Sequence, residues 1–381
     1  MEFINLKAQY KEYKEEINTK IAKVLESSHF ILGEEVEKFE TEIAKYVGRK
    51  YAVACSDGTA ALQLACMAYG IGAGDAVFCP DMTFIASVEP ACLLGATPVF
   101  CDIDKKSYNI DIHSLQCQIE NVIKEGKLTP KAIVAVDFVG NPIDYHKIKK
   151  IAEKYNLLLI EDAAQGIGGT YYGKKCGSLG DISTTSFFPS KPLGCYGDGG
   201  AVFTDDKRIY SLLKSLRVHG KGNSKYDNIH IGINSRLDEL QAAILNVKLK
   251  YLPVEIEKRQ ELAENYELKL GNIVKTPYIM KDSVSAYAQY IIMTKGMEQR
   301  DALVRYLDGR NIPTIQYYPN PLHKLPVFNE IEVYSEKFVN ACQYAERALG
   351  IPFSAFLDNE EQEFIIRTIK EYFEYGNLQE N

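Results

Sequence analysis

Short apolar segments recur between Tyr51 and Thr204, and this alternation with helical stretches constrains the fold more than any other feature of the sequence. Each segment is about five residues long, a usual length for a strand. The predicted strands are Tyr51–Cys55, Asp75–Cys79, Thr97–Cys101, Ala132–Val136, Leu157–Ile160, Thr184–Phe188 and Gly200–Thr204. Apolar residues at helical spacing predict helices at Tyr10–Leu25, Glu34–Tyr46, Ala60–Tyr69, Ser87–Leu94 and Tyr145–Tyr155. Buried strands that alternate with helices predict an α/β fold with a largely parallel sheet.

The last two predicted strands depart from this pattern. A glycine-rich loop joins Thr184–Phe188 to Gly200–Thr204, and it is too short for the helical crossover that parallel neighbours need. We therefore expect these two strands to form a hairpin or another antiparallel element.

The C-terminal third has a different organisation. A helix that starts at Arg236 is expected to end at Leu252, because Pro253 follows, and a second, charged helix is expected over Val254–Leu270. The remaining predicted elements are a strand at Ala286–Thr294, a helix at Glu298–Asn311, a proline-rich loop at Pro313–Pro326 and helices at Val333–Leu349 and Asn359–Tyr375. These elements predict a smaller C-terminal α+β domain over residues 251–381, beside a large domain over residues 1–250.

Composition argues against several classes of function. The 381 residues carry a formal net charge of −7, which disfavours binding to nucleic acids or anionic membranes. No apolar segment is long enough to span a membrane, and the first ten residues lack the apolar core of a secretion signal. The nine cysteines show no Cys-x-x-Cys spacing and several lie in apolar segments, so we expect reduced cysteines without disulfides or a zinc site. These features predict a cytoplasmic protein.

Lys191 is the first candidate for chemistry. It lies in the segment Ser-Phe-Phe-Pro-Ser-Lys-Pro-Leu-Gly that starts at Ser186, among apolar and small residues. Burial disfavours the ammonium form of a lysine and lowers its pKa, which makes the amine nucleophilic toward carbonyl groups. The alternative is a surface lysine in a turn, and this segment alone does not decide between them.

Two further segments follow predicted strands, where α/β proteins bind ligands. Asp162 lies in Glu-Asp-Ala-Ala-Gln, and its carboxylate could keep a pyridine nitrogen protonated; taken alone, a helix N-cap is the more common use. Gly58 and Thr59 open a predicted helix, where free backbone N–H groups can hold a phosphate. Any strand-to-helix turn shares this second pattern.

Metal chemistry finds no support in the sequence. Asp102-Ile103-Asp104 has the Asp-x-Asp form of metal-dependent sugar transferases, but its position at the end of a strand favours a capping or turn role. His219, His230 and His323 show no metal-ligand spacing. We expect no metal site.

Five segments occur in a characteristic order. They are Gly-Thr at a helix start, Glu-Asp-Ala-Ala-Gln, Ser-Phe-Phe-Pro-Ser-Lys-Pro-Leu-Gly, Gly-Asp-Gly-Gly-Ala-Val-Phe-Thr, and Gly-Ile-Asn-Ser-Arg-Leu-Asp-Glu-Leu-Gln-Ala-Ala. Together they resemble the DegT/StrS-type nucleotide-sugar aminotransferases, over nearly the whole chain. The resemblance implies an enzyme of fold type I, the aspartate aminotransferase-like fold, with pyridoxal 5′-phosphate (PLP) as cofactor and a mostly parallel seven-stranded sheet in the large domain.

The resemblance also implies roles for individual residues. Lys191 would bind PLP covalently and act as general base and acid, while Asp162 would pair with the ring nitrogen. The further cofactor-binding residues would be Gly58, Thr59, Ala60, Phe84, Gln165, Ser186 and, from the partner subunit of a homodimer with shared active sites, Asn234. The substrate-binding residues would be Arg236, which suits a carboxylate, together with Tyr317, Tyr318 and His323.

The implied reaction transfers an amino group from L-glutamate, which leaves as 2-oxoglutarate, to a nucleotide-linked keto sugar. The stretches 185–204 and 231–245 most resemble the subgroup that acts on UDP- or dTDP-linked 3-keto sugars for surface polysaccharides such as lipopolysaccharide; a 4-keto sugar is the alternative. A PLP-dependent sugar dehydrase is a further reading, but relatives of that type carry histidine where Lys191 stands. A non-catalytic sugar-sensing protein is another, and it would need a broken cofactor site.

Two positions depart from the family pattern. Ala60 stands where Asp is frequent after Gly-Thr, and Tyr317-Tyr318-Pro319 stands where His-Tyr-Pro is frequent. The second change lies in a loop that faces the sugar in relatives, so it bears on which sugar is bound. His323 follows in the same loop, where capping of a neighbouring helix is as good an interpretation as contact with substrate.

Overall fold

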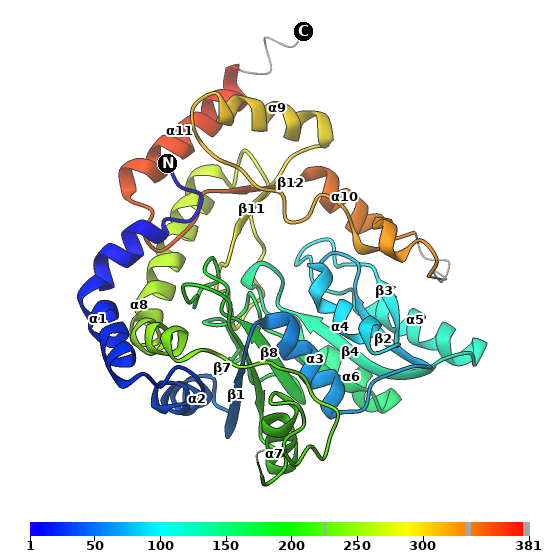
Figure 1. The fold of residues 1–381 in the computed structure, drawn as a ribbon. Helices are drawn as coiled ribbons and strands as arrows, with labels where there is room; N and C mark the ends of the chain where they lie inside the picture. Colours follow the sequence, from blue (N-terminus) through cyan, green and yellow to red (C-terminus); the bar gives the residue numbers. More distant parts are fainter. Residues whose placement is uncertain (225, 332–336, 376–381) are drawn as a thin grey trace.

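The computed structural model describes residues 1–224, 226–331 and 337–375. A seven-stranded sheet forms the core of the larger half (Figure 1). Its strands are β1 (Tyr51–Cys55), β2 (Asp75–Pro80), β3 (Thr97–Cys101), β4 (Thr129–Val136), β5 (Leu158–Asp162), β8 (Ile182–Ser186) and β9 (Gly200–Thr204). They lie in the order β1-β9-β8-β5-β4-β2-β3. This confirms the predicted α/β fold with a mostly parallel seven-stranded sheet.

β9 is the one strand of this sheet that runs against its neighbours. It pairs antiparallel with β8 on one side and with β1 on the other, while the remaining pairs are parallel. The predicted antiparallel element is therefore confirmed. Its consequence is local: the loop between β8 and β9 turns back directly beside the carboxyl end of β5.

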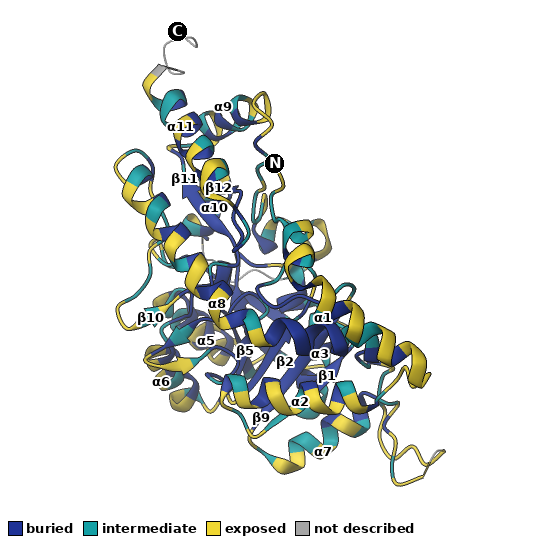
Figure 2. Ribbon diagram, turned by 90° about the vertical axis from the view of Figure 1, so that its left-hand side faces the viewer, coloured by how far each residue is buried: buried dark blue, intermediate teal, exposed yellow. Residues whose placement is uncertain are grey.

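Helices cover both faces of the sheet (Figures 1 and 2). They are α1 (Leu6–Ser27), α2 (Glu34–Val47), α3 (Gly58–Ala68), α4 (Glu89–Leu93), α5 (Ile112–Glu125), α6 (Tyr145–Tyr155) and α7 (Lys207–Leu216). Successive strand residues serve opposite faces: Ala52 and Ala54 of β1 belong to one apolar cluster, and Val53 and Cys55 belong to the other. Burial on both faces explains why these strands read as continuous apolar segments.

The smaller half packs helices on a two-stranded antiparallel sheet. Its elements are β11 (Tyr290–Met293), α9 (Met297–Asp308), α10 (Val339–Arg347), β12 (Ala348–Ile351) and α11 (Asn359–Tyr375). A third apolar cluster joins β11, α9, β12 and α11 to α8 (Glu239–Leu270), while the buried residues of α10 belong to a cluster of the large sheet. The short elements are β6 (Thr170–Tyr171), β7 (Lys174–Lys175), β10 (Ser283–Val284), η1 (Ile85–Ser87), η2 (Phe138–Gly140), η3 (Leu322–Lys324) and η4 (Pro326–Phe328).

The helix expected at Val333–Leu349 differs from the structure at its end. Its expected start falls on residues 332–336, which lie outside the described residues. Its expected end was wrong, because Ala348 and Leu349 pair with β11 as part of β12. Pairing with a distant strand overrides the local helical pattern here.

α8 is a single helix of 32 residues and corrects another expectation. The predicted break after Leu252 was wrong, because the helix continues through Pro253. A proline removes one helical hydrogen bond, but buried side chains on both sides of it, such as Leu252 and Ile256, anchor the helix to the core. The division into domains at residue 250 stays a prediction, and α8 passes through that point.

Within the described ranges, no helix combines the length and apolar character that crossing a membrane requires.

Candidate active site

A pocket of about 520 Å³ lies where the carboxyl ends of the sheet strands face the smaller half. It brings together many residues that the sequence predicted for the site. These are Gly58, Thr59, Phe84, Asp162, Gln165, Ser186, Lys191, Tyr317 and Tyr318. The carboxyl ends of parallel strands are the usual ligand site in α/β folds, and here three strand ends and the proline-rich loop of the smaller half converge.

Lys191 lies in the loop between β8 and β9, and backbone hydrogen bonds fix the loop around it. Lys191 N donates to Phe188 O at 2.9 Å, and Cys195 N donates to Phe187 O at 2.8 Å. Gly194 lets the chain return closely, because a Cβ there would lie 2.5 Å from Pro189 O. Burial lowers the pKa of the Lys191 amine, while the nearby Asp162 carboxylate opposes this shift.

Asp162 is the last residue of β5 and is buried. Ser87 Oγ donates to its Oδ2 at 2.8 Å, and Ala164 N donates to its Oδ1 at 3.1 Å. Burial raises the pKa of Asp162, and these hydrogen bonds together with Lys191 lower it. The N-cap interpretation of Asp162 is not borne out, since a turn and not a helix follows it.

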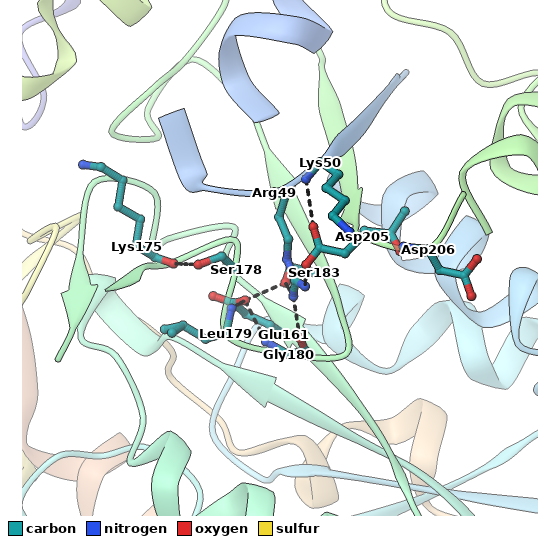
Figure 3. A network of polar contacts seen from close by, with 11 residues as sticks. Arg49, Lys50, Glu161, Lys175, Ser178, Leu179, Gly180, Ser183, Asp205 and Asp206 are labelled. Carbon is teal, nitrogen blue, oxygen red and sulfur yellow. Dashed lines mark hydrogen bonds and ion pairs between the residues drawn. The ribbon is translucent and has the colours of Figure 1, made fainter. Parts of the chain in front are cut away.

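Glu161, the preceding residue, fixes the position of β5 (Figure 3). Its carboxylate accepts hydrogen bonds from Gly177 N at 2.6 Å, Leu179 N at 2.6 Å and Ser183 Oγ at 2.6 Å. Neighbouring strand residues point to opposite faces, so this anchorage on one face holds Asp162 toward the other. Arg49 joins the same network through Ser183 Oγ and an ion pair with Asp205.

The start of α3 provides a cradle for a phosphate. Asp57 caps the helix by accepting a hydrogen bond from Ala60 N at 2.8 Å, so the Ala60 N–H is already used. The first N–H groups of a helix have no acceptor within it, which leaves those of Gly58 and Thr59 for a ligand. A Cβ on Gly58 would lie 2.7 Å from Ser186 Cβ, so the cradle closes tightly against β8.

Gln165 and Tyr318 connect the two halves across the pocket. Gln165 Oε1 accepts a hydrogen bond from Val139 N at 2.6 Å, and its Nε2 lies 3.4 Å from Tyr318 OH. The Tyr318 ring lies 5.8 Å from that of Phe84. These aromatic rings form one wall of the pocket.

Four predicted site residues do not line this pocket. Ala60 points into the core, and Asn234 and Arg236 lie beyond the pocket on the segment before α8, with Asn234 exposed. His323 contacts Asp81 instead: its N donates to Oδ1 at 2.9 Å, and its Nδ1 lies 2.5 Å from Oδ2.

Sequence reasoning missed Ser87 and Gln289, which both line the pocket. No pattern of spacing marks either residue, because their contacts arise from segments far apart in the chain. Ser87 is the first residue of the helix predicted at Ser87–Leu94, and helical spacing does not indicate that its hydroxyl reaches Asp162.

The acidic residues outside the pocket have hydrogen-bonding roles. Asp102 caps α10 by accepting from Asn340 N at 3.0 Å, and Asp104 accepts from Ser107 N at 2.7 Å, which confirms the capping and turn interpretation. Asp137, Glu161 and Cys176 lie within metal-ligand distance of one another. Tyr145 OH donates to Asp137 at 2.9 Å, and Glu161 is surrounded by N–H and O–H donors, which disfavours a cation there.

The pocket residues fit PLP. Asp162 is a carboxylate whose pKa is raised by burial, and a protonated ring nitrogen would place a positive charge beside it. The closed cradle at Gly58 fits a phosphate, and Lys191 has an amine whose lowered pKa favours bonding to an aldehyde carbon.

Comparisons with known proteins agree with this fit. Residues 11–370 match the model of the DegT/DnrJ/EryC1/StrS aminotransferase family. The chain is 41% identical to the UDP-2-acetamido-2-deoxy-3-oxo-D-glucuronate aminotransferase of Pseudomonas aeruginosa, over 94% of this chain and 96% of the relative. A crystal structure of an aminotransferase of this family from Brucella abortus superposes with a TM-score of 0.96 and 43% identity, over 98% of this chain and 99% of that one. The ntda protein of Bacillus subtilis, solved with bound cofactor PMP, gives a TM-score of 0.86 and 29% identity, over 95% of this chain and 82% of that one.

Proposed function

Because this chain belongs to the DegT/DnrJ/EryC1/StrS aminotransferase family, we propose that it transfers an amino group from L-glutamate to the 3-keto position of a UDP-linked sugar. The chain is a PLP-dependent aminotransferase. The substrate of the Pseudomonas relative, a UDP-linked 3-oxo sugar, supports this choice of sugar. We propose that the amino sugar that forms is used in surface-polysaccharide synthesis.

The observation that carries the proposal is the meeting of Lys191 and Asp162 in one pocket beside the start of α3. When bound, PLP supplies an electron-withdrawing ring that stabilises negative charge on the carbon next to the reacting nitrogen. Asp162 keeps the ring nitrogen protonated, and Ser87 holds the Asp162 carboxylate in place. Lys191 moves the proton between the donor carbon and the cofactor, which its lowered pKa favours.

The remaining site residues have proposed binding roles. Tyr317 and Tyr318 contact the sugar from the proline-rich loop, and Gln165 orients the cofactor ring. Arg236 binds the carboxylate of the amino donor with a bidentate fork. Asn234 and Arg236 lie outside the pocket of their own chain, so we propose a homodimer in which this segment completes the partner's site.

The first test replaces the proposed covalent anchor. The holoenzyme should show a visible absorption band from PLP bound to Lys191, and Lys191→Ala should remove both the band and turnover. Lys207→Ala, which changes an exposed lysine on α7, serves as the control and should keep both. Full turnover in Lys191→Ala would falsify the proposed role.

The second test identifies the sugar. UDP- and dTDP-linked 3-keto and 4-keto sugars are offered with glutamate, and the products are identified by mass. We expect amination of the UDP-linked 3-keto sugar. Activity on 4-keto sugars alone would defeat the 3-keto assignment, and release of ammonia without amine transfer would instead indicate a sugar dehydrase.

A further inference from the structure

A second cavity, of about 590 Å³, lies at the seam between the two halves of the molecule. Its walls come from the loop after β3, the segment between α8 and β10, the end of β11 and the end of α10. Residues that matter for its chemistry are Lys105, Tyr108, Lys275, Lys295, Tyr344 and Arg347. It shares no lining residue with the catalytic pocket, and nothing in the proposed reaction uses it.

The charge of this seam cavity is strongly one-sided. Its basic residues are Lys105, Lys275, Lys295 and Arg347, and the acidic residue among its lining residues is Glu374. Lys275 Nζ donates to Lys105 O at 2.8 Å and lies 4.8 Å from the centre of the Tyr108 ring, so this ammonium group is fixed in the cavity wall.

The surroundings of Lys275 act on the pKa of its amine. Burial lowers the pKa of Lys275 first, and the neighbouring charges of Lys106, Arg347 and Lys105 lower it further, while Asp104 opposes them. The Asp104 carboxylate already accepts hydrogen bonds from the backbone of the following turn. Four basic residues therefore line the cavity against one acidic lining residue, Glu374, and Asp104 beside Lys275 offsets part of their charge.

Three lining residues also leave buried polar atoms without a partner in the described structure. They are the hydroxyl groups of Tyr108 and Tyr344 and the Nε of Arg347. A buried donor without an acceptor costs about 1–3 kcal/mol, so three in one place call for an explanation. An anion with several acceptor oxygens would supply the missing acceptors, directly or through ordered water.

We propose that the seam cavity binds a small phosphate-bearing anion, held by Arg347, Lys275 and Lys105. Arginine with its planar fork suits phosphate oxygens, and several cations around one cavity suit a ligand with more than one negative charge. The volume of about 590 Å³ accommodates a diphosphate, alone or as part of a nucleotide. This binding site is additional to the proposed catalytic function and does not depend on which sugar is aminated.

A wall of aromatic rings connects the seam cavity to the catalytic pocket. Ring centres lie 4.7 Å apart for Tyr108 and Tyr344, 5.6 Å for Tyr344 and Phe138, and 6.3 Å for Phe138 and Tyr318. Tyr318 lines the catalytic pocket. The seam cavity and the catalytic pocket are thus joined by one run of packed aromatic side chains.

The test measures binding of inorganic pyrophosphate to the PLP-saturated holoenzyme by calorimetry, so that the cradle at α3 is already filled. Lys105→Gln combined with Lys275→Gln, and separately Arg347→Gln, should each weaken binding by about tenfold or more. Lys207→Ala, a control on a different basic surface, should leave binding unchanged. Thermal unfolding and kcat without pyrophosphate should stay near the wild-type values in the double lysine variant, which shows that its fold is intact.

Two results would overturn the proposal. One is the absence of binding to the wild-type holoenzyme at millimolar pyrophosphate. The other is equal binding by the wild type and the double lysine variant. UDP, with uridine as the control that lacks phosphate, distinguishes the source of the phosphate. UDP that binds both proteins equally occupies the catalytic pocket alone and counts against a nucleotide in the seam cavity. Pyrophosphate binding that requires Lys105 and Lys275 supports the site.

Discussion

At the scale of single residues, Lys248 is a buried cation directly beneath the loop that carries Lys191. Its side chain is 2% exposed, its Nζ donates to Gly194 O at 2.7 Å, and the Tyr196 ring centre lies 4.2 Å away. Burial lowers the pKa of Lys248 to about 8, while the nearby Glu255 and Cys195 raise it. Lys248 therefore holds the loop that carries Lys191, and the free-energy cost of burying its ammonium group depends on pH.

This cost predicts a pH dependence of stability. The folded-state pKa of Lys248 lies below the ordinary value of 10.5, so the unfolded chain binds more protons between about pH 8 and 10.5 and stability rises with pH in that window. Lys248→Met removes this contribution. The free energy of unfolding of the wild type, relative to Lys248→Met, should rise by about 3 kcal/mol at most from pH 8 to 10.5 in urea titrations. A constant difference across this range would contradict the assignment.

Asp162→Asn tests the charge next to the cofactor ring. The amide keeps the shape of the side chain but loses the charge that holds the ring nitrogen protonated, so kcat should fall by about 100-fold or more. The visible band should persist, because Lys191 is intact. Asp198→Asn, an exposed carboxylate at the same pocket, should change kcat far less. Similar losses in both variants would argue against a specific role for Asp162.

The site residues divide by how far the sequence could predict them. Asp162 ends β5, and Gly58 opens the helix that follows β1. Because strand ends lie together at one edge of a parallel sheet, their meeting could be expected. Ser87 and Gln289 reach the pocket through contacts between distant segments, which no local spacing encodes. The sequence left His323 open between a substrate contact and the capping of a neighbouring helix, and in the structure its ring pairs with the buried Asp81.

At the scale of elements, Pro253 in the middle of α8 carries a measurable cost. It is exposed, and it cannot donate the helical hydrogen bond to Leu249 O. Pro253→Ala should raise the free energy of unfolding by about 1–3 kcal/mol in chemical denaturation. Val254→Ala, at the exposed neighbouring position, should change it by less than about 0.5 kcal/mol. A lower free energy of unfolding in Pro253→Ala would contradict this prediction and would indicate that the proline favours the native geometry of α8.

The elements show what local patterns can and cannot predict. Strands buried on both faces were predicted because their apolar character is continuous. α5 was missed although Leu115, Ile119 and Val122 have helical spacing, and α7 was missed in a similar way. β12 could not be predicted, because its backbone forms a strand only where β11 offers a partner.

At the scale of the whole molecule, the proposed shared site predicts complementation between two inactive proteins. Lys191→Ala lacks the amine, and Asn234→Asp places a negative charge beside the phosphate of the partner's site. Mixed dimers would have one intact site, built from Lys191 of one subunit and Asn234 of the other. After unfolding and refolding together in equal amounts, the mixture should recover about a quarter of wild-type activity. Recovery at the level of the two separate proteins would show that Asn234 serves its own chain.

The continuity of α8 bears on the construction of hybrid enzymes. A helix of 32 residues is about 48 Å long, and its first turns pack under the large sheet while its last turns belong to the core of the smaller half. Exchanging sugar-recognising halves between relatives by joining them at residue 250 would mix two sequences within one helix and disturb both of its packing faces. A junction just after Leu270 leaves the helix whole, and hybrids joined there should fold in higher yield than hybrids joined at residue 250.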